Sequence, residues 1–150
     1  MPVTLYRVDQ DRWDADEQVR IDLTRIYGDA PDERIKAPPG TYILTHLSQG
    51  FFWAAQFNDR LLGAVAVSPD EQGWRLFDLC VRKTTRRRGV GSRLLALVSA
   101  EAGQLGLELR VRASQLELAD QVLLQRLGYC LTRDGDYFQL DLSTTGDSGQ

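Results

Sequence analysis

The chain has 150 residues, of which 43% are hydrophobic and 26% are charged. This length and composition fit one soluble domain with an ordinary hydrophobic core. No run of about eighteen apolar residues occurs, so we expect no membrane-spanning segment. The first residues have neither a basic nor an apolar region, so we expect no secretory signal either. The net charge of −3 argues against general nucleic-acid binding.

The N-terminal quarter predicts a strand, a helix and a loop. Apolar and polar residues alternate over Val3–Val8, which is typical of a strand. Asp14 and Glu17 have the spacing of a helix-capping box, and apolar residues then recur at helical intervals. We therefore expect a first helix over Asp14–Tyr27. The next segment, Gly28–Gly40, contains three prolines and is expected to be a loop.

The middle of the chain predicts a short helix followed by three strands. Thr41–Gln49 has the pattern of a short helix. Two runs rich in β-forming residues, Phe51–Phe57 and Arg60–Ser68, follow it. The dipeptide Asn58-Asp59 separates them, and both residue types tolerate positive φ, so we expect a two-residue hairpin turn. Trp74–Arg82 predicts a further strand.

The C-terminal part alternates helices and strands. The expected elements are a helix over Gly91–Leu105, a strand over Leu107–Ala113, a helix over Leu116–Leu127, and two strands that begin at Tyr129 and Tyr137. Residues 143–150 are polar and are expected to form a disordered tail. Strands interspersed with helices predict one α/β domain over residues 1–142, built on a single mixed sheet of about seven strands.

Cysteine and histidine are rare in this chain. Cys80 and Cys130 lie inside apolar patterns without metal-ligand spacing, so we expect both to be small buried residues. His46 is the only histidine, and we expect it to be a partly exposed helix residue. A histidine-based catalytic pair or metal site would have to use this side chain.

Basic residues concentrate between Arg82 and Arg93, where six basic and no acidic residues occur in an otherwise acidic chain. A strand that ends at Val81 precedes this segment, and a helix begins inside it. Gly89 and Gly91 let backbone N–H groups approach a phosphate closely, and the positive end of the helix dipole adds attraction. Three consecutive arginines before the glycines can donate charge-assisted hydrogen bonds. The segment therefore predicts a pyrophosphate site.

This phosphate motif is neither a P-loop nor a Rossmann fingerprint, because G-x-x-x-x-G-K-[ST] is absent and Leu94 stands where a third glycine is needed. Arg86–Gly91 instead reads R-x-x-G-x-G after a strand, which resembles the acyl-CoA-binding motif of GNAT acetyltransferases. The order of predicted elements and the string RLGY at Arg126–Tyr129 are similar to the same family. Two alternatives stay open, a solvated basic helix start in another α/β protein and a nuclear-localisation signal.

The resemblance implies a GNAT-like fold, with a mostly antiparallel sheet and three to four helices, that binds acetyl-CoA or CoA. It implies that the main chain of Leu79, Cys80 and Val81 pairs with the pantetheine arm as an added strand would. The residues that it places at the pyrophosphate and the other phosphates are Arg86, Arg87, Arg88, Gly89, Val90, Gly91 and Ser92.

The usual GNAT catalytic positions do not carry catalytic residues here, so we assign none. Acetylation of an amine commonly needs a base and an acid. By the resemblance, the base position falls at Phe77 or Arg75, with Asp78 expected on the wrong face of the strand. The acid position falls at Leu124. Glu117 stands near the place where many family members carry an asparagine.

Substitutes for the missing pair stay open. Water or Glu108 could serve as the base, and Tyr129 or Tyr137 could serve as the acid. Both tyrosines are also expected as ordinary core or strand residues.

Three segments narrow the resemblance to one branch of the fold. Gln18–Tyr27, Ala54–Val67 and Val81–Leu95 are similar to the PanZ/PanM family of aspartate decarboxylase maturation and regulatory factors. The resemblance implies a cytoplasmic bacterial protein that binds acetyl-CoA and then aspartate decarboxylase. It places Asn58 and the three arginines near the partner surface, although Asn58 is also explained by its turn.

The chain departs from this family at its surface. Gln56 stands where a basic residue is expected, the segment Gly28–Gly50 is longer, and the tail Ser143–Gln150 is extra. Two functions therefore remain, a CoA-sensing regulator of aspartate decarboxylase and, as the alternative, an N-acetyltransferase acting on an amine of a small molecule or protein. Nucleic-acid binding is a third class, which the acidic remainder of the chain disfavours.

Overall fold

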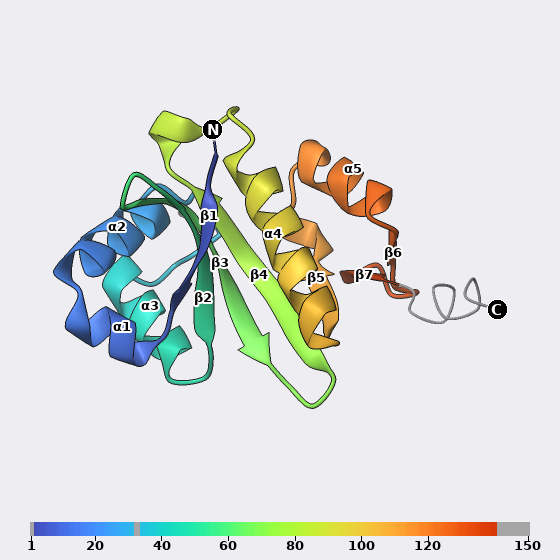
Figure 1. Cartoon of the computed structure of the whole chain (residues 1–150), viewed down its shortest axis with the longest axis horizontal. Helices are drawn as coiled ribbons and strands as arrows, with labels where there is room; N and C mark the ends of the chain where they lie inside the picture. Colours follow the sequence, from blue (N-terminus) through green and yellow to red (C-terminus); the bar gives the residue numbers. More distant parts are fainter. Residues whose placement is uncertain (1, 32–33, 141–150) are drawn as a thin grey trace.

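Seven strands form one sheet in the computed structural model, which describes residues 2–31 and 34–140 (Figure 1). The spatial order is β1-β2-β3-β4-β5-β7-β6, and all neighbours are antiparallel except the parallel pair β4 and β5. The strands are β1 Thr4–Val8, β2 Phe51–Phe57, β3 Arg60–Pro69, β4 Gly73–Val81, β5 Glu108–Arg112, β6 Tyr129–Leu131 and β7 Tyr137–Leu140. This confirms the predicted α/β fold with its mixed, mostly antiparallel sheet.

Five α-helices lie in the described part of the chain, one more than the three to four that we predicted. They are α1 Gln10–Ala15, α2 Glu17–Gly28, α3 Pro39–Leu47, α4 Val90–Leu105 and α5 Leu118–Arg126. The predicted helix Asp14–Tyr27 is wrong because Asp16 leaves the helical region, with φ −128° and ψ 107°. Its carboxylate accepts hydrogen bonds from the backbone N–H groups of Gln18 and Val19, so Asp16, and not Asp14, is the residue that caps the start of α2.

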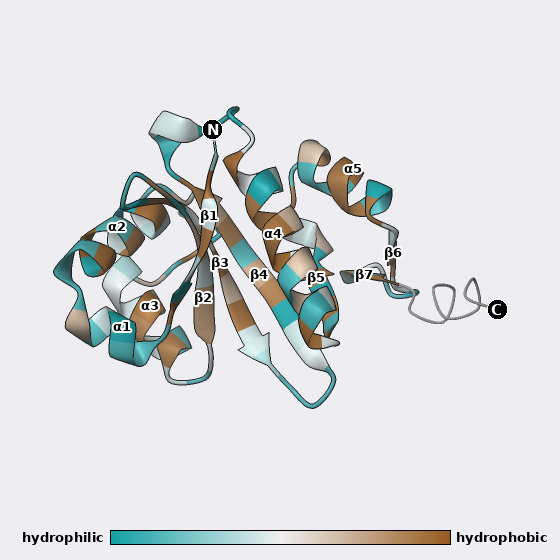
Figure 2. Cartoon of the chain, viewed as in Figure 1, coloured by the Kyte–Doolittle hydropathy of each residue, from teal (hydrophilic) through white to brown (hydrophobic). Residues whose placement is uncertain are grey.

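The sheet is buried on both faces, with α1, α2 and α3 on one side and α4 on the other (Figure 1). Strand β2 shows this clearly: Phe51, Trp53 and Ala55 belong to the core under α4, whereas Phe52 and Ala54 belong to the core under α2 and α3. Hydrophobic colouring accordingly runs along the central strands (Figure 2). No helix in the described ranges has both the length and the hydropathy needed to cross a membrane.

Burial corrects two expectations about reactive side chains. His46 is 7% exposed, and its Nε2 lies 2.9 Å from the carbonyl oxygens of Phe51 and Val67. It is therefore a core residue, and burial lowers the pKa of its imidazole. Cys80 is buried as predicted, but Cys130 is exposed, because β6 is an edge strand that pairs only with β7.

Two backbone features prepare the site. Asn58 and Asp59 have φ values of 50° and 62°, which confirms the two-residue hairpin turn between β2 and β3. Ala64 of β3 pairs with Cys80 of β4, whereas Ala66 of β3 pairs with Phe77, so two residues of β4 lie opposite one residue of β3. This is a β-bulge, and one of its residues, Asp78, has φ 54°.

The predicted end of the domain at residue 142 and the tail over 143–150 lie outside the described residues.

Candidate functional site

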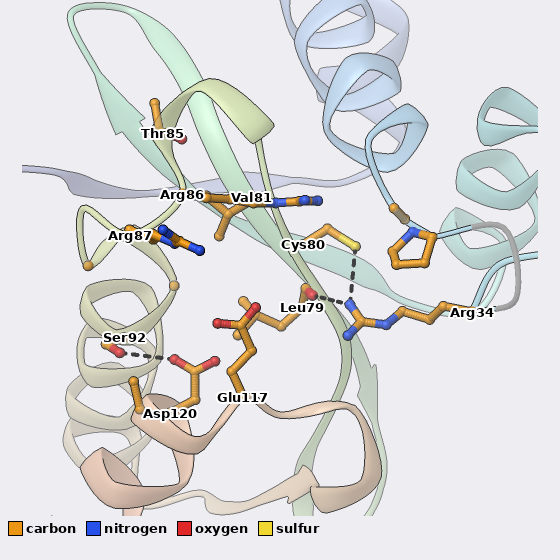
Figure 3. A pocket seen from close by; sticks show the side chains of 15 residues that line it. Arg34, Leu79, Cys80, Val81, Thr85, Arg86, Arg87, Ser92, Glu117 and Asp120 are labelled. Carbon is orange, nitrogen blue, oxygen red and sulfur yellow. Dashed lines mark hydrogen bonds between the residues drawn. The ribbon is translucent and has the colours of Figure 1, made fainter.

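A cavity of about 440 Å³ lies where β4 separates from β5 (Figure 3). The two strands pair over Gly73–Leu76 and Glu108–Val111, and β4 then continues through its bulge to Val81 with no neighbouring strand on that side among the described residues. The cavity is lined by Ala30, Pro31, Arg34, Leu79, Cys80, Val81, Thr85, Arg86, Arg87, Gly89, Gly91, Ser92, Glu117, Ala119 and Asp120. The opening thus combines an unpaired strand edge, the start of α5 and the basic segment between β4 and α4 (residues 82–91), called here the arginine–glycine loop.

The N-terminus of α4 points its backbone donors at this cavity. The first hydrogen bond of the helix runs from the N–H of Arg93 to the carbonyl of Gly89 over 2.9 Å. The N–H groups of Val90, Gly91 and Ser92 precede it and therefore have no partner within the helix. Gly89 has φ 77°, which glycine adopts without strain. The arrangement is a helix-end anion site with arginines beside it.

The predicted binding residues divide into three groups. Arg88 is exposed and does not line the cavity, and the side chain of Val90 is buried in the core, so only its main chain faces the loop. Asn58 is exposed at the hairpin turn and is likewise outside the cavity lining. The remaining predicted residues all line the cavity; they are Leu79, Cys80, Val81, Arg86, Arg87, Gly89, Gly91 and Ser92.

Asp29, at the end of α2, fixes the arginine loop. Its carboxylate accepts hydrogen bonds from Nε of Arg82 over 2.9 Å and from the N–H of Lys83 over 3.0 Å. Its carbonyl accepts one from Nη2 of Arg86 over 2.8 Å. Burial raises the pKa of this carboxyl, but these donors and the two positive charges lower it more, so the pKa of Asp29 lies below its usual value. The loop is therefore held in place before any ligand arrives.

Two acids from the start of α5 face the basic loop across the cavity (Figure 3). Asp120 is 8% exposed and accepts a hydrogen bond from Oγ of Ser92 over 2.9 Å. Burial raises the pKa of Asp120; the hydrogen bond from Ser92 opposes this shift, and the nearby Glu117 adds to it. The cavity therefore has a cationic wall and an acidic wall, and of the two acids sequence reasoning singled out only Glu117.

Arg34, from the loop between α2 and α3, also lines the cavity. Its Nη1 donates to the carbonyl of Leu79 over 2.9 Å and lies 3.9 Å from Sγ of Cys80. Burial raises the pKa of the Cys80 thiol to about 11, although the Arg34 guanidinium opposes this shift, so the thiol is neutral at ordinary pH. Sequence reasoning missed Arg34 because a proline-rich loop has no periodicity that predicts where its side chains point.

The base position falls at Phe77 or Arg75, and the acid position falls at Leu124. Arg75 lies on β4 with its Nε 3.8 Å from the carboxylate of Asp70 and does not line the cavity, and the other two side chains are apolar. The ring of Phe77 packs edge-on against His46, with the ring centroids 5.3 Å apart. Leu124 is fully buried in the core under α4. Neither side chain lines the cavity.

The suggested substitutes also lie outside the cavity lining. The hydroxyl groups of Tyr129 and Ser99 are 2.8 Å apart, in the part of the core under α4. Tyr137 lies on β7 beneath the guanidinium of Arg110, and Glu108 pairs with Gly73 at the opposite end of β4 from the bulge. Among the described residues, no group of three His, Cys, Asp or Glu side chains could hold a metal ion.

The side chain of Asp78 does not lie on the face of β4 that simple strand alternation predicts. The bulge interrupts the alternation of β4, so the carboxylate of Asp78 turns toward α3, where it accepts a hydrogen bond from the hydroxyl of Tyr42. The hydroxyl of Tyr27 donates to the Asp78 carbonyl over 2.9 Å. Asp78 is 9% exposed and immediately precedes the cavity residue Leu79. Asp78 thus lies on the α3 side of β4, as Phe77 does, so the expectation that it faces away from the base position is incorrect.

The fold and the strand–loop–helix site define the class of protein. The solution NMR structure of YhhK from Escherichia coli bound to coenzyme A superposes with a TM-score of 0.60 and 27% identity, covering 94% of this chain and 100% of that chain. The PaiA N-acetyltransferase from Thermoplasma acidophilum in complex with coenzyme A superposes with a TM-score of 0.61 and 13% identity, covering 93% and 98%. The chain thus has the fold of the GNAT acetyltransferases.

Sequence comparison defines the family within that class. A family profile described as "Acetyltransferase (GNAT) domain, PanZ" matches residues 5–125, and the chain belongs to this family. The PanD regulatory factor of Escherichia coli strain K12 is 35% identical over 95 residues, which are 63% of this chain and 65% of the relative. The match therefore spans slightly less than two thirds of the relative's length.

Proposed function

We propose that this protein binds acetyl-CoA or CoA as a signal and, in the bound state, promotes and regulates the maturation of aspartate decarboxylase. One observation carries the proposal: a preformed anion site opens beside an unpaired strand edge, while the sought acid-base positions are occupied by Phe77 and Leu124. Such a site can hold a CoA thioester without consuming it. Family membership and relatives named PanD regulatory factor support the choice of partner.

The cavity fits the parts of CoA. The free N–H groups at the start of α4 suit the pyrophosphate, and Arg86 and Arg87 lie beside them. A Cβ placed on Gly91 would lie 3.4 Å from Val81 and 3.6 Å from Leu79, which both line the cavity, so a side chain at this position would take up space inside the opening. The unpaired edge of β4 suits the amide groups of the pantetheine arm, which would add to it as a strand does.

The partner surface is proposed at two exposed features. Asn58 is at the tip of the β2–β3 hairpin, and Arg88 is exposed and outside the cavity lining although both of its neighbours line it. A ligand bound between the arginine–glycine loop and the edge of β4 would stabilise the form that the decarboxylase recognises. Binding of the ligand and of the partner would then strengthen each other by the same factor.

The acidic wall predicts a pH-dependent affinity for CoA. Glu117 and Asp120 face the proposed position of the phosphates, and burial raises the pKa of Asp120, so Asp120 takes up a proton at a higher pH than an ordinary carboxyl does. Removing one unit of negative charge from this wall is worth about 1 kcal/mol of phosphate binding in a water-filled groove, or about fivefold in affinity. We expect Asp120→Asn to bind CoA about fivefold more tightly than wild type at pH 8.

The measurement is calorimetric titration with CoA between pH 5.5 and 8. The 3′-phosphate of CoA titrates in the same range, so the decisive quantity is the ratio of the variant's affinity to that of wild type. This ratio should shrink toward one as the pH falls, because Asp120 becomes neutral in wild type as well. Equal affinities at pH 8 would show that Asp120 carries no charge that the ligand senses.

The alternative function is an N-acetyltransferase, and Asp78 is the observation that favours it. Its carboxylate is nearly buried, is hydrogen-bonded to Tyr42 and is next to the cavity in sequence, so a base could act from the α3 side of β4. Burial, together with the hydrogen bond to Asp78, raises the pKa of Tyr42, which keeps its hydroxyl protonated. This alternative predicts thiol release that Asp78→Asn abolishes.

One experiment separates the two functions. The protein is incubated with acetyl-CoA and either a panel of small amines and lysine peptides or the aspartate decarboxylase proenzyme. The regulator predicts a complex with the proenzyme in size-exclusion chromatography and no release of CoA thiol above the buffer rate. Thiol release with an amine and no complex would replace the regulator with the enzyme.

A further inference from the structure

The carbonyl of Leu79 lies on the unpaired edge of β4 and is already engaged by a side chain. Strand β5 accompanies β4 only as far as Leu76, so beyond that residue this edge is open to any partner that brings N–H donors. The donor present is Nη1 of Arg34, at 2.9 Å, and its guanidinium also lies near Sγ of Cys80 (Figure 3). Arg34 thus occupies the cavity position that an added strand would need.

The segment that carries Arg34 touches both halves of the cavity. Ala30 and Pro31 line the cavity as Arg34 does, and the N–H of Arg34 donates to the carbonyl of Pro31 over 3.0 Å. Asp29, just before them, accepts from Arg82, Lys83 and Arg86 of the basic loop. One side of the cavity therefore holds the phosphate loop in place while it blocks a backbone acceptor on β4.

We propose that Arg34 is a gate that competes with the pantetheine arm for the Leu79 carbonyl. This inference rests on the proposed CoA site. The guanidinium occupies the open edge of β4 at this carbonyl, so an arm that adds along the edge displaces it and breaks one charge-assisted hydrogen bond. Arg34 then lowers the affinity for ligands that carry the arm and leaves the affinity for the nucleotide half unchanged. The contact makes the protein respond to higher CoA concentrations than the open site would.

The test compares CoA with 3′-phospho-ADP, which has the phosphates of CoA but no arm. Arg34→Met should bind CoA about tenfold more tightly than wild type, as expected for the loss of a competing bond to a charged donor. Its affinity for 3′-phospho-ADP should stay level or fall slightly with the lost positive charge. Arg34→Lys keeps the charge without the planar fork and should lie between the two.

Arg126→Met is the matched control, because Arg126 is exposed and lies outside the cavity lining. It should bind both probes as wild type does, and thermal unfolding checks that every variant is folded. If wild type and the control bind CoA but Arg34→Met and Arg34→Lys bind it no more tightly, the gate is refuted and the CoA site stands. If wild type binds neither probe, the proposed function fails together with the gate.

Discussion

Gly91→Ala is expected to weaken CoA binding by at least about tenfold without unfolding the protein. The added Cβ would lie 3.4 Å from Val81, 3.6 Å from Leu79 and 3.7 Å from Asp120, which are ordinary contacts. All three neighbours line the cavity, so the methyl group would lie inside the opening that a phosphate must enter to reach the helix N-terminus. Alanine in place of glycine in a helix adds about 0.5–1 kcal/mol of stability, so lost binding cannot be attributed to unfolding.

Thermal unfolding with and without CoA measures this effect. At about 100 times its dissociation constant, a ligand stabilises wild type by about 2.7 kcal/mol, or roughly 5–10 °C in Tm for a chain of this size. At the same CoA concentration a tenfold weaker Gly91→Ala should keep about 1.4 kcal/mol of stabilisation, or about half of this shift, and less if binding weakens further. Gly103→Ala is the control: it lies in α4, nothing is within 4 Å of its added Cβ, and it is outside the cavity lining. An undiminished shift for Gly91→Ala would refute binding at the α4 N-terminus.

Asp22→Ala is expected to cost about 3 kcal/mol of unfolding free energy, and to lower Tm by roughly 6–12 °C. Asp22 is 2% exposed, and its carboxylate accepts hydrogen bonds from Nε and Nη2 of Arg60, the N–H of Leu61 and the side chain of Gln18. Alanine would leave the buried N–H of Leu61 without this acceptor. The same contacts hold the base of the hairpin that carries Asn58, so partner binding should weaken as well.

The pH dependence of stability follows from the same residue. Burial alone raises the pKa of Asp22, but the hydrogen bonds from Arg60, Leu61 and Gln18 lower it more, so the folded pKa lies below the usual value. The stabilisation that the ionised Asp22 carboxylate gives to the folded state is complete above the unfolded pKa of about 3.9. It is lost as the pH falls through the folded pKa. Asp22→Ala should therefore differ most from wild type at neutral pH and least in strong acid.

Asp14→Ala is the control for this substitution. Asp14 is exposed on α1, where its carboxylate accepts one hydrogen bond from the side chain of Gln10. Its loss should change the unfolding free energy by less than about 0.5 kcal/mol. Chemical denaturation at pH 7 compares the two variants, and a cost below about 1 kcal/mol for Asp22→Ala would contradict the role given to its ion pair.

The sheet and the arginine–glycine loop were predictable because their signals are local. Alternation identifies a strand, Asn58-Asp59 identifies a tight turn, and glycines after a run of arginines predict the cavity-lining loop at the start of α4. The break at Asp16 was missed because two acids two residues apart both suit a helix start. Only the tertiary path of the chain decides between them.

The residues that complete the site could not be read from patterns. The bulge at Asp78 depends on how β4 pairs with β3, and one extra residue reverses the face that parity assigns. Arg34 reaches Leu79 across 45 positions of the sequence, and Asp120 meets Ser92 across 28. Such contacts follow from the packing of distant segments, which a single sequence does not encode in any local period.

The most direct test of the central claim is the affinity of this protein for aspartate decarboxylase, titrated by calorimetry with and without saturating acetyl-CoA. We predict that acetyl-CoA tightens the complex by at least about tenfold, and that the decarboxylase tightens acetyl-CoA binding by the same factor, as linkage requires. Gly91→Ala should lose this gain. Equal decarboxylase affinity in the presence and absence of acetyl-CoA, or no complex under either condition, would contradict the account.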